Sequence, residues 1–157
     1  MARDQYCDCD SRPPRLLFAI AGASARFYAA YNSIGFVSDG GGTFFIPRRV
    51  GSRRAAEFLM LNQTWSAQQA EQYGLVSRVV EDAQLEVESL ALAQQIAAGP
   101  TRTYGEMKRL LISTPEQPLE TQLELEARAI ALCARTEDCW NAIGAVMTRR
   151  KPEFTGR

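Results

Sequence analysis

The residues best suited to chemistry lie in the stretch YNSIGFVSDGGGTFFIPRRVG, residues 31–51, where Asp39 directly precedes three glycines. A carboxylate can carry a proton between two atoms, and an apolar environment suits it to this work because it favours the protonated form. The side chains that could form such an environment are Ile34, Phe36, Val37, Phe44 and Phe45. A second role stays open, since an Asp before Gly-Gly-Gly-Thr can simply cap the next helix.

Composition excludes several other chemistries. The chain has 157 residues and no histidine, which removes Ser-His and Cys-His nucleophile pairs and the commonest zinc ligand. Cys7 and Cys9 alternate with Asp8 and Asp10, but no second ligand pair lies nearby, so we expect no metal site. Eighteen basic residues balance eighteen acidic residues, which argues against a nucleic-acid partner.

Length and hydropathy favour one soluble domain. A chain of 157 residues is long enough for a sizeable core, and its apolar runs are too short to span a membrane. The N-terminus lacks the form of a signal peptide, so we expect a cytoplasmic protein. Residues 1–15 are polar and contain Pro13-Pro14, which predicts a flexible leader before a folded domain over residues 16–157.

Short elements flank the glycine loop. The apolar run 16–27, interrupted by Gly22, fits either a buried strand or a buried helical turn. After the loop, Ala55, Phe58 and Leu59 have helical spacing, and this helix is expected to stop near Asn62, a residue type that tolerates left-handed backbone.

A second pair of short elements follows. Ser66 to Gln69 fit a capping box that starts a helix of about two turns, with Gly74 after its end. Residues 75–81 alternate like a short strand or an extended linker.

The second half of the chain is predicted to be helical. A helix over 84–98 stops at Gly99-Pro100, Thr101 caps the next helix, and Pro118 begins a third. Their inward faces are expected to hold Leu85, Leu92 and Ile96, then Tyr104, Met107, Leu110 and Leu111, then Leu119, Leu123, Ile130 and Ala134.

The last helix is bounded by charge. Thr136, Glu137 and Asp138 open it with negative charge, and Arg149, Arg150 and Lys151 close it with positive charge, as the helix dipole prefers. These elements describe a helix-rich domain with one glycine-centred loop. They do not name a function.

The order of the motifs resembles one family. SARFYAAYNSIGFVSDGGGTFFIPRRVG, followed by AAEFLMLNQTWSAQQAEQYGLVSRVV and a final RRKPEFTGR, is similar to the crotonase family of enoyl-CoA hydratases and isomerases. The resemblance covers roughly residues 19–157 and is nearest in motif to phenylacetate-pathway and Δ-isomerase-type members. It implies the C-terminal part of the α/β crotonase fold, helix-rich in this chain. The family's N-terminal half, with its spiral of β-turns and an oxyanion-hole amide, is expected to be absent.

The resemblance also implies roles for residues around the loop. Hydratases of the family carry a glutamate where this chain has Tyr31, so hydration by two carboxylates is not expected. Asp39 matches the aspartate that moves a proton along the acyl chain in isomerase-type members. Gly40 and Gly41 would let the thioester approach the backbone, and Tyr31 would line the substrate pocket.

The resemblance extends to partners. Lys151 and Phe154 match residues that reach the CoA nucleotide, commonly that of a neighbouring subunit, which implies a homo-oligomer built of trimers. An acyl-CoA thioester would be the substrate, and no cofactor beyond it is expected. Isomerase-type proton transfer is therefore the predicted activity. An inactive binding or assembly module derived from such an enzyme is the alternative.

Overall fold

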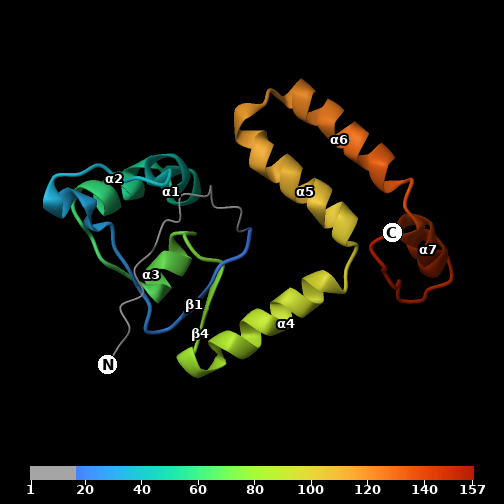
Figure 1. Cartoon of the computed structure of the whole chain (residues 1–157), viewed down its shortest axis with the longest axis horizontal. Helices are drawn as coiled ribbons and strands as arrows, with labels where there is room; N and C mark the ends of the chain where they lie inside the picture. Colours follow the sequence, from blue (N-terminus) through green and yellow to red (C-terminus); the bar gives the residue numbers. More distant parts are fainter. Residues whose placement is uncertain (1–16) are drawn as a thin grey trace. The chain divides into compact units, whose positions relative to one another are not determined.

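The computed structural model describes residues 17–157, and these residues form two compact units (Figure 1). The first unit ends at Ser89, and the second runs from Leu90 to Arg157. Helix α4 (Leu85–Ala97) begins in the first and continues into the second. The leader expected over residues 1–15 and the cysteine pair Cys7 and Cys9 lie outside the described residues.

Two small sheets organise the first unit. Strand β1 (Ile20–Gly22) pairs in parallel with β4 (Arg78–Val80), with Ala21 opposite Val79. Strand β2 (Arg26–Phe27) pairs antiparallel with β3 (Trp65–Ser66). The apolar run for which strand and helical turn both remained open is therefore a strand. Its partner lies in residues 75–81, where a short strand and an extended linker both remained open, and this segment is a strand as well.

Short helices surround these strands. Their bounds are η1 (Ala30–Ile34), α1 (Gly42–Val50), α2 (Ser52–Met60), α3 (Ala67–Gln72) and η2 (Asp82–Gln84). Helices α1 and α2 follow each other and pack together (Figure 1). Gly51, with φ 84°, separates them.

Trp65 is the centre of the first unit's core. Its side chain is only 2% exposed, and its ring lies 4.3 Å from that of Phe58 and 5.0 Å from that of Tyr73, centroid to centroid. Ala55 is buried beside them, as its helical spacing with Phe58 predicted. This cluster ties α2 to the β2–β3 sheet and thereby fixes the start of the chain segment that carries Asp39.

Local signals placed the elements around α3 correctly. Asn62 has φ 51°, the left-handed backbone expected at the end of α2. The Ser66 hydroxyl accepts from the Gln69 amide, and the Gln69 side chain accepts from the Ser66 amide, which completes the predicted capping box. Gly74 follows the helix with φ 80°.

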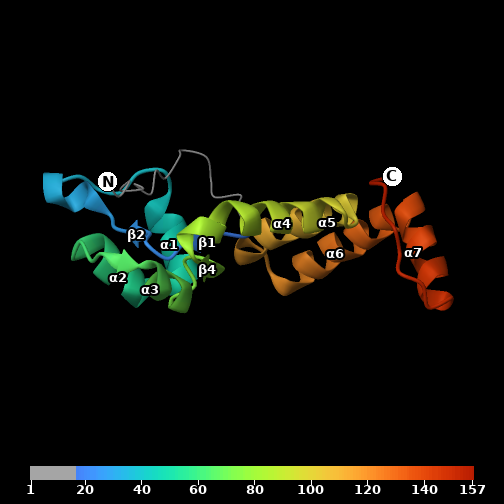
Figure 2. The same ribbon diagram turned by 90° about the horizontal axis from the view of Figure 1, so that it is seen from below.

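The second unit contains the longer helices, α5 (Thr101–Ser113), η3 (Thr114–Glu116), α6 (Leu119–Cys133) and α7 (Glu137–Met147). Helices α5 and α6 lie side by side and run in opposite directions in both Figure 1 and Figure 2. The predicted α7 cap is confirmed, because the Thr136 hydroxyl accepts from the Cys139 amide. No helix among residues 17–157 is long and apolar enough to cross a membrane.

Three helix-end predictions were wrong. Thr101 is the first residue of α5 and caps nothing with its side chain, because the Pro100 carbonyl already accepts the Tyr104 amide. Pro118 precedes α6, because its ψ of 155° is extended. The cluster Arg149 to Lys151 follows α7, because Arg149 turns into left-handed backbone with φ 56°.

The predicted inward faces were only partly right. Leu85, Leu92 and Ile96 are half-buried on α4. Of the predicted α5 face, only Leu110 is half-buried, and the exposed members are Tyr104, Met107 and Leu111. The whole predicted stripe of α6 is exposed, namely Leu119, Leu123, Ile130 and Ala134. Periodicity identifies an apolar face, but it does not say what covers that face.

Candidate functional site

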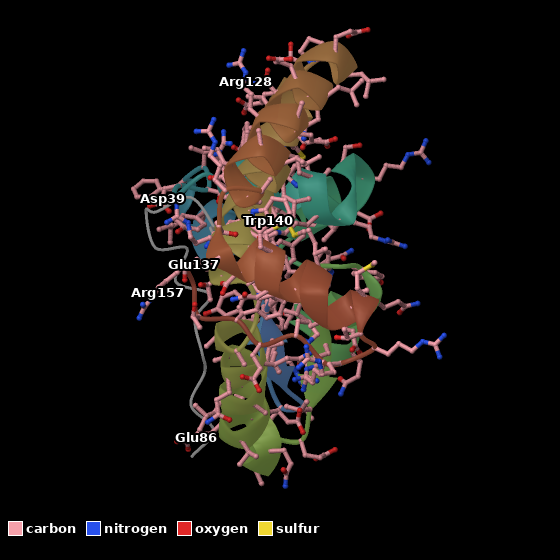
Figure 3. All side chains as sticks on the ribbon, turned by 90° about the vertical axis from the view of Figure 1, so that its right-hand side faces the viewer. Asp39, Glu86, Arg128, Glu137, Trp140 and Arg157 are labelled. Carbon is pink, nitrogen blue, oxygen red and sulfur yellow. The ribbon has the colours of Figure 1, made fainter. Side chains whose placement is uncertain are left out.

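Asp39 lies on the loop between η1 and α1, and its side chain is exposed (Figure 3). Helix α1 has Gly41 as its N-cap, and no side chain caps it. The Gly42 amide donates to the backbone carbonyl of Asp39 at 2.9 Å. The capping role considered for the Asp39 carboxylate is therefore wrong, because a backbone oxygen takes that position.

The Asp39 carboxylate instead accepts a hydrogen bond from Tyr31. The distance from the Tyr31 hydroxyl to Oδ1 of Asp39 is 2.7 Å. The chain turns back between the two residues because Gly35 is left-handed, with φ 74°, and the Phe36 amide donates to the Tyr31 carbonyl at 2.9 Å. Tyr31 therefore bonds to the following loop through its carbonyl and its hydroxyl, and the hydroxyl orients the Asp39 carboxylate.

The apolar environment expected around Asp39 is not formed by its neighbours in the described chain. Ile34, Phe36 and Val37 are 69%, 67% and 78% exposed. They occupy the end of η1 and the irregular segment after it. This exposed apolar group next to a carboxylate is a surface on which an apolar ligand or a further protein segment could pack.

The glycines of the loop have a defined conformational purpose. Gly40 and Gly41 have φ values of 56° and 82°, a region that residues with a Cβ rarely adopt. A Cβ on Gly41 would also lie 2.8 Å from the Phe45 ring. The tight entry into α1 therefore depends on glycine, whatever ligand approaches it.

We expect Gly41→Ala to destabilise the first unit by about 1–2 kcal/mol, because alanine is strained in left-handed backbone and the added methyl meets Phe45. The matched control is Gly105→Ala in α5, where a Cβ meets nothing within 4 Å. That change should stabilise its helix by up to about 1 kcal/mol. Chemical denaturation of both variants measures the difference, and equal effects of the two would contradict the role given to Gly41.

The predicted CoA-contacting residues lie in the second unit. Lys151 is exposed and Phe154 is half-buried on the segment that follows α7. Tyr31, Asp39 and the glycines thus share one loop of the first unit, while Lys151 and Phe154 share one segment of the second.

Sequence reasoning assigned Asp138 only to the helix dipole and missed its partners. This carboxylate is 4% exposed and accepts hydrogen bonds from Thr155 and Gly156. The Thr155 amide is the main reason that the pKa of Asp138 lies below its ordinary value; burial acts in the opposite direction, and the Gly156 amide lowers it further. The sequence did offer one signal for these partners. Thr136 already caps α7, so the acidic residue two positions later is not needed as a cap.

Apart from the predicted site residues, the described part of the chain contains a small cavity but no candidate metal site. A small cavity of about 100 Å³ in the second unit is lined by Arg102, Glu106, Leu132, Cys133 and Thr136. Within residues 17–157, no group of three or more His, Cys, Asp or Glu side chains could hold a metal ion.

Comparison with known proteins decides the family. Residues 18–157 match the family model described as enoyl-CoA hydratase/isomerase. The chain belongs to the enoyl-CoA hydratase/isomerase family. The crotonase resemblance is thereby confirmed.

Relatives of this family add detail. The chain is 36% identical over 138 residues to the 1,2-epoxyphenylacetyl-CoA isomerase of Escherichia coli K12, covering 88% of this chain and 53% of that protein. It is 34% identical over 139 residues to the 2,3-dehydroadipyl-CoA hydratase of the same organism, covering 88% and 54%. The chain spans about half the length of the curated relatives it matches.

A solved structure agrees with the fold. The crystal structure of an enoyl-CoA hydratase from Bacillus anthracis is similar with a TM-score of 0.85 and 29% identity, over 90% of this chain and 55% of that chain. The predicted α/β crotonase fold, helix-rich in this chain, is confirmed. The relatives include both an isomerase and a hydratase by name, so membership of the family does not choose between these activities.

Proposed function

We propose that this chain acts on an acyl-CoA thioester by isomerase-type proton transfer, with Asp39 as the general acid and base. One observation carries the proposal: the Asp39 carboxylate is exposed on the glycine loop and is oriented there by the Tyr31 hydroxyl at 2.7 Å. A carboxylate so held has one oxygen engaged by Tyr31 and the other available to a substrate.

The chemistry is a proton transfer between two carbons. From a trans-2-enoyl thioester, Asp39 would remove a proton from carbon 4 and deliver a proton to carbon 2, while the double bond moves from C2–C3 to C3–C4. No atom or electron is gained or lost in the sum. Hydration would instead need a group that activates water, and the Tyr31 hydroxyl is not such a base because it donates its hydrogen to Asp39.

The backbone beside Asp39 suits the approach of an acyl-CoA thioester. Gly40 and Gly41 offer backbone without side chains next to Asp39, so a thioester can approach closely. Lys151 would pair with a phosphate of the nucleotide, and Phe154 would contact its apolar surface.

Exchange with solvent deuterium tests the proposal. A carboxylate that carries the proton exchanges it with water between turnovers, so trans-2-enoyl-CoA incubated with the protein in D₂O should gain deuterium in its acyl chain. Proton NMR of the recovered thioester measures this. Absence of any deuterium above the protein-free control, at protein concentrations that saturate the thioester, would contradict proton transfer by this chain.

A binding or assembly module without activity is the second candidate, and one observation favours it. The second unit exposes large apolar side chains on each of its three later helices, among them Met107, Ile130 and Trp140. Such faces commonly mark protein interfaces. A homo-oligomer would cover them.

We expect the protein to self-associate, and sedimentation velocity should show an apparent mass that rises with concentration. The double substitution Leu123→Glu and Ile130→Glu should abolish this rise, because it places charges on the exposed α6 stripe. Thr121→Glu, on an exposed polar position of the same helix, is the control. A monomer at all concentrations would contradict the assembly candidate.

A further inference from the structure

Asp138 is the one buried charged side chain among residues 17–157. It sits in the first turn of α7, where Thr136 already supplies the cap by accepting from the Cys139 amide. The carboxylate is therefore not needed to begin the helix. A buried carboxylate is costly unless hydrogen bonds compensate it, so its partners indicate its purpose.

All partners of the Asp138 carboxylate lie at the end of the chain's last segment. Oδ1 accepts from the Thr155 amide at 2.7 Å and from the Thr155 hydroxyl at 3.1 Å. Oδ2 accepts from the Gly156 amide at 2.8 Å. The Asp138 amide in turn donates to the Arg157 carbonyl at 3.0 Å. One residue thus holds three consecutive residues of this segment beside the first turn of α7, where Arg157 is labelled in Figure 3.

The other end of the segment is anchored at the opposite end of α7. The Arg150 amide donates to the Ala145 carbonyl at 2.8 Å, across the left-handed Arg149. Residues 151–154 therefore form a loop that is fixed at both ends and runs back along the helix (Figure 1). Lys151 and Phe154 are both within it.

We propose that Asp138 is a positioning residue, which holds this loop so that Lys151 and Phe154 together face the nucleotide of CoA. The inference rests on the proposed function for the CoA contacts. The hydrogen bonds between Asp138 and residues 155–157, which we call the clamp, do not depend on that function. Only a carboxylate supplies acceptors to two neighbouring amides and a hydroxyl at once; asparagine would turn an amino group toward one of the amides.

Hydrogen exchange tests the clamp without any ligand. In Asp138→Ala, the Thr155 and Gly156 amides should lose protection by about tenfold or more, because they lose charge-assisted hydrogen bonds. Asp138→Asn should lie between alanine and the unaltered protein. Glu137→Gln removes a neighbouring exposed carboxylate of the same helix turn and should leave both amides unchanged. Equal protection in Asp138→Ala and the unaltered protein would overturn the clamp.

Titration with free coenzyme A tests positioning. Phe154→Ala and Asp138→Ala should each raise the Kd for CoA, by about tenfold if one engaged contact is lost. The double variant should bind no more weakly than the weaker single variant, because Asp138 acts through the loop that carries Phe154. The Kd is measured from the NMR chemical shifts of the backbone amides of residues 150–157 during the titration, a method that covers Kd values into the millimolar range.

The outcomes separate the two proposals. If Phe154→Ala weakens CoA binding while Asp138→Ala does not, the positioning role is overturned and the proposed function stands. Independent, multiplicative effects of the two substitutions would also overturn it. If the unaltered protein shows no CoA-dependent shifts while the Asp138→Ala exchange result is as expected, the proposed CoA contacts fail and the clamp stands as a structural element only.

Discussion

Replacing Asp39 by asparagine is expected to lower isomerase turnover by about a hundredfold or more, because the change removes the group that carries the proton. Asparagine keeps an oxygen that can accept from the Tyr31 hydroxyl, so the loop should keep its shape. The structure gives Asp39 no capping role in α1. Stability should therefore change by less than about 1 kcal/mol.

The measurement combines turnover on a trans-enoyl-CoA with thermal melts of the same preparations. Glu57→Gln on α2 is the control, since it also converts an exposed carboxylate of the first unit to an amide. Tyr31→Phe separates orientation from proton transfer, because it removes the hydroxyl and leaves the carboxylate. Turnover that is the same in Asp39→Asn as in Glu57→Gln would show that Asp39 carries no proton.

The largest effect on stability is expected from Trp65→Ala, at about 3–5 kcal/mol. Trp65 fills the centre of the first unit's core against Phe58 and Tyr73, and its removal leaves a cavity that the short strands β2 and β3 cannot close. A loss of this size is a large part of the whole stability of a small unit. Much of the first unit should therefore be unfolded at temperatures where the unaltered protein is folded.

The chain offers a control of the same residue type. Trp140 on α7 is 66% exposed, and Figure 3 labels it there, so Trp140→Ala should change stability by less than about 1 kcal/mol. Urea denaturation followed by far-UV circular dichroism compares the two variants, because this signal comes mainly from the helical backbone and does not rely on tryptophan fluorescence. Similar midpoints for both would mean that Trp65 does not hold the first unit together.

The same tryptophan shows where prediction from the sequence ended. Its main partners, Phe58 and Tyr73, belong to two different helical segments that the β2–β3 pairing brings together. Helical spacing did identify Ala55 and Phe58 as the buried face of α2.

The sequence alone determined several of the features whose hydrogen bonds close within a few residues. The Ser66–Gln69 capping box, the Thr136 cap and the left-handed Asn62 were all predicted, because each depends on the backbone and side chains of one turn. The order of motifs also identified the family, since a motif is read along the chain.

Only the tertiary structure decided which distant groups meet. The Ala19 amide donates a hydrogen bond to the Ser77 hydroxyl, 58 residues away, which helps to hold the first apolar run as a strand. The Asp138 carboxylate accepts from the Thr155 amide, 17 residues away. Asp39 could cap or could face outward until the Tyr31 hydroxyl, eight residues away, was placed. Local propensity cannot choose among such outcomes, because a side chain's free energy depends on partners that loop closure brings to it, and those partners are set by the packing of the whole unit.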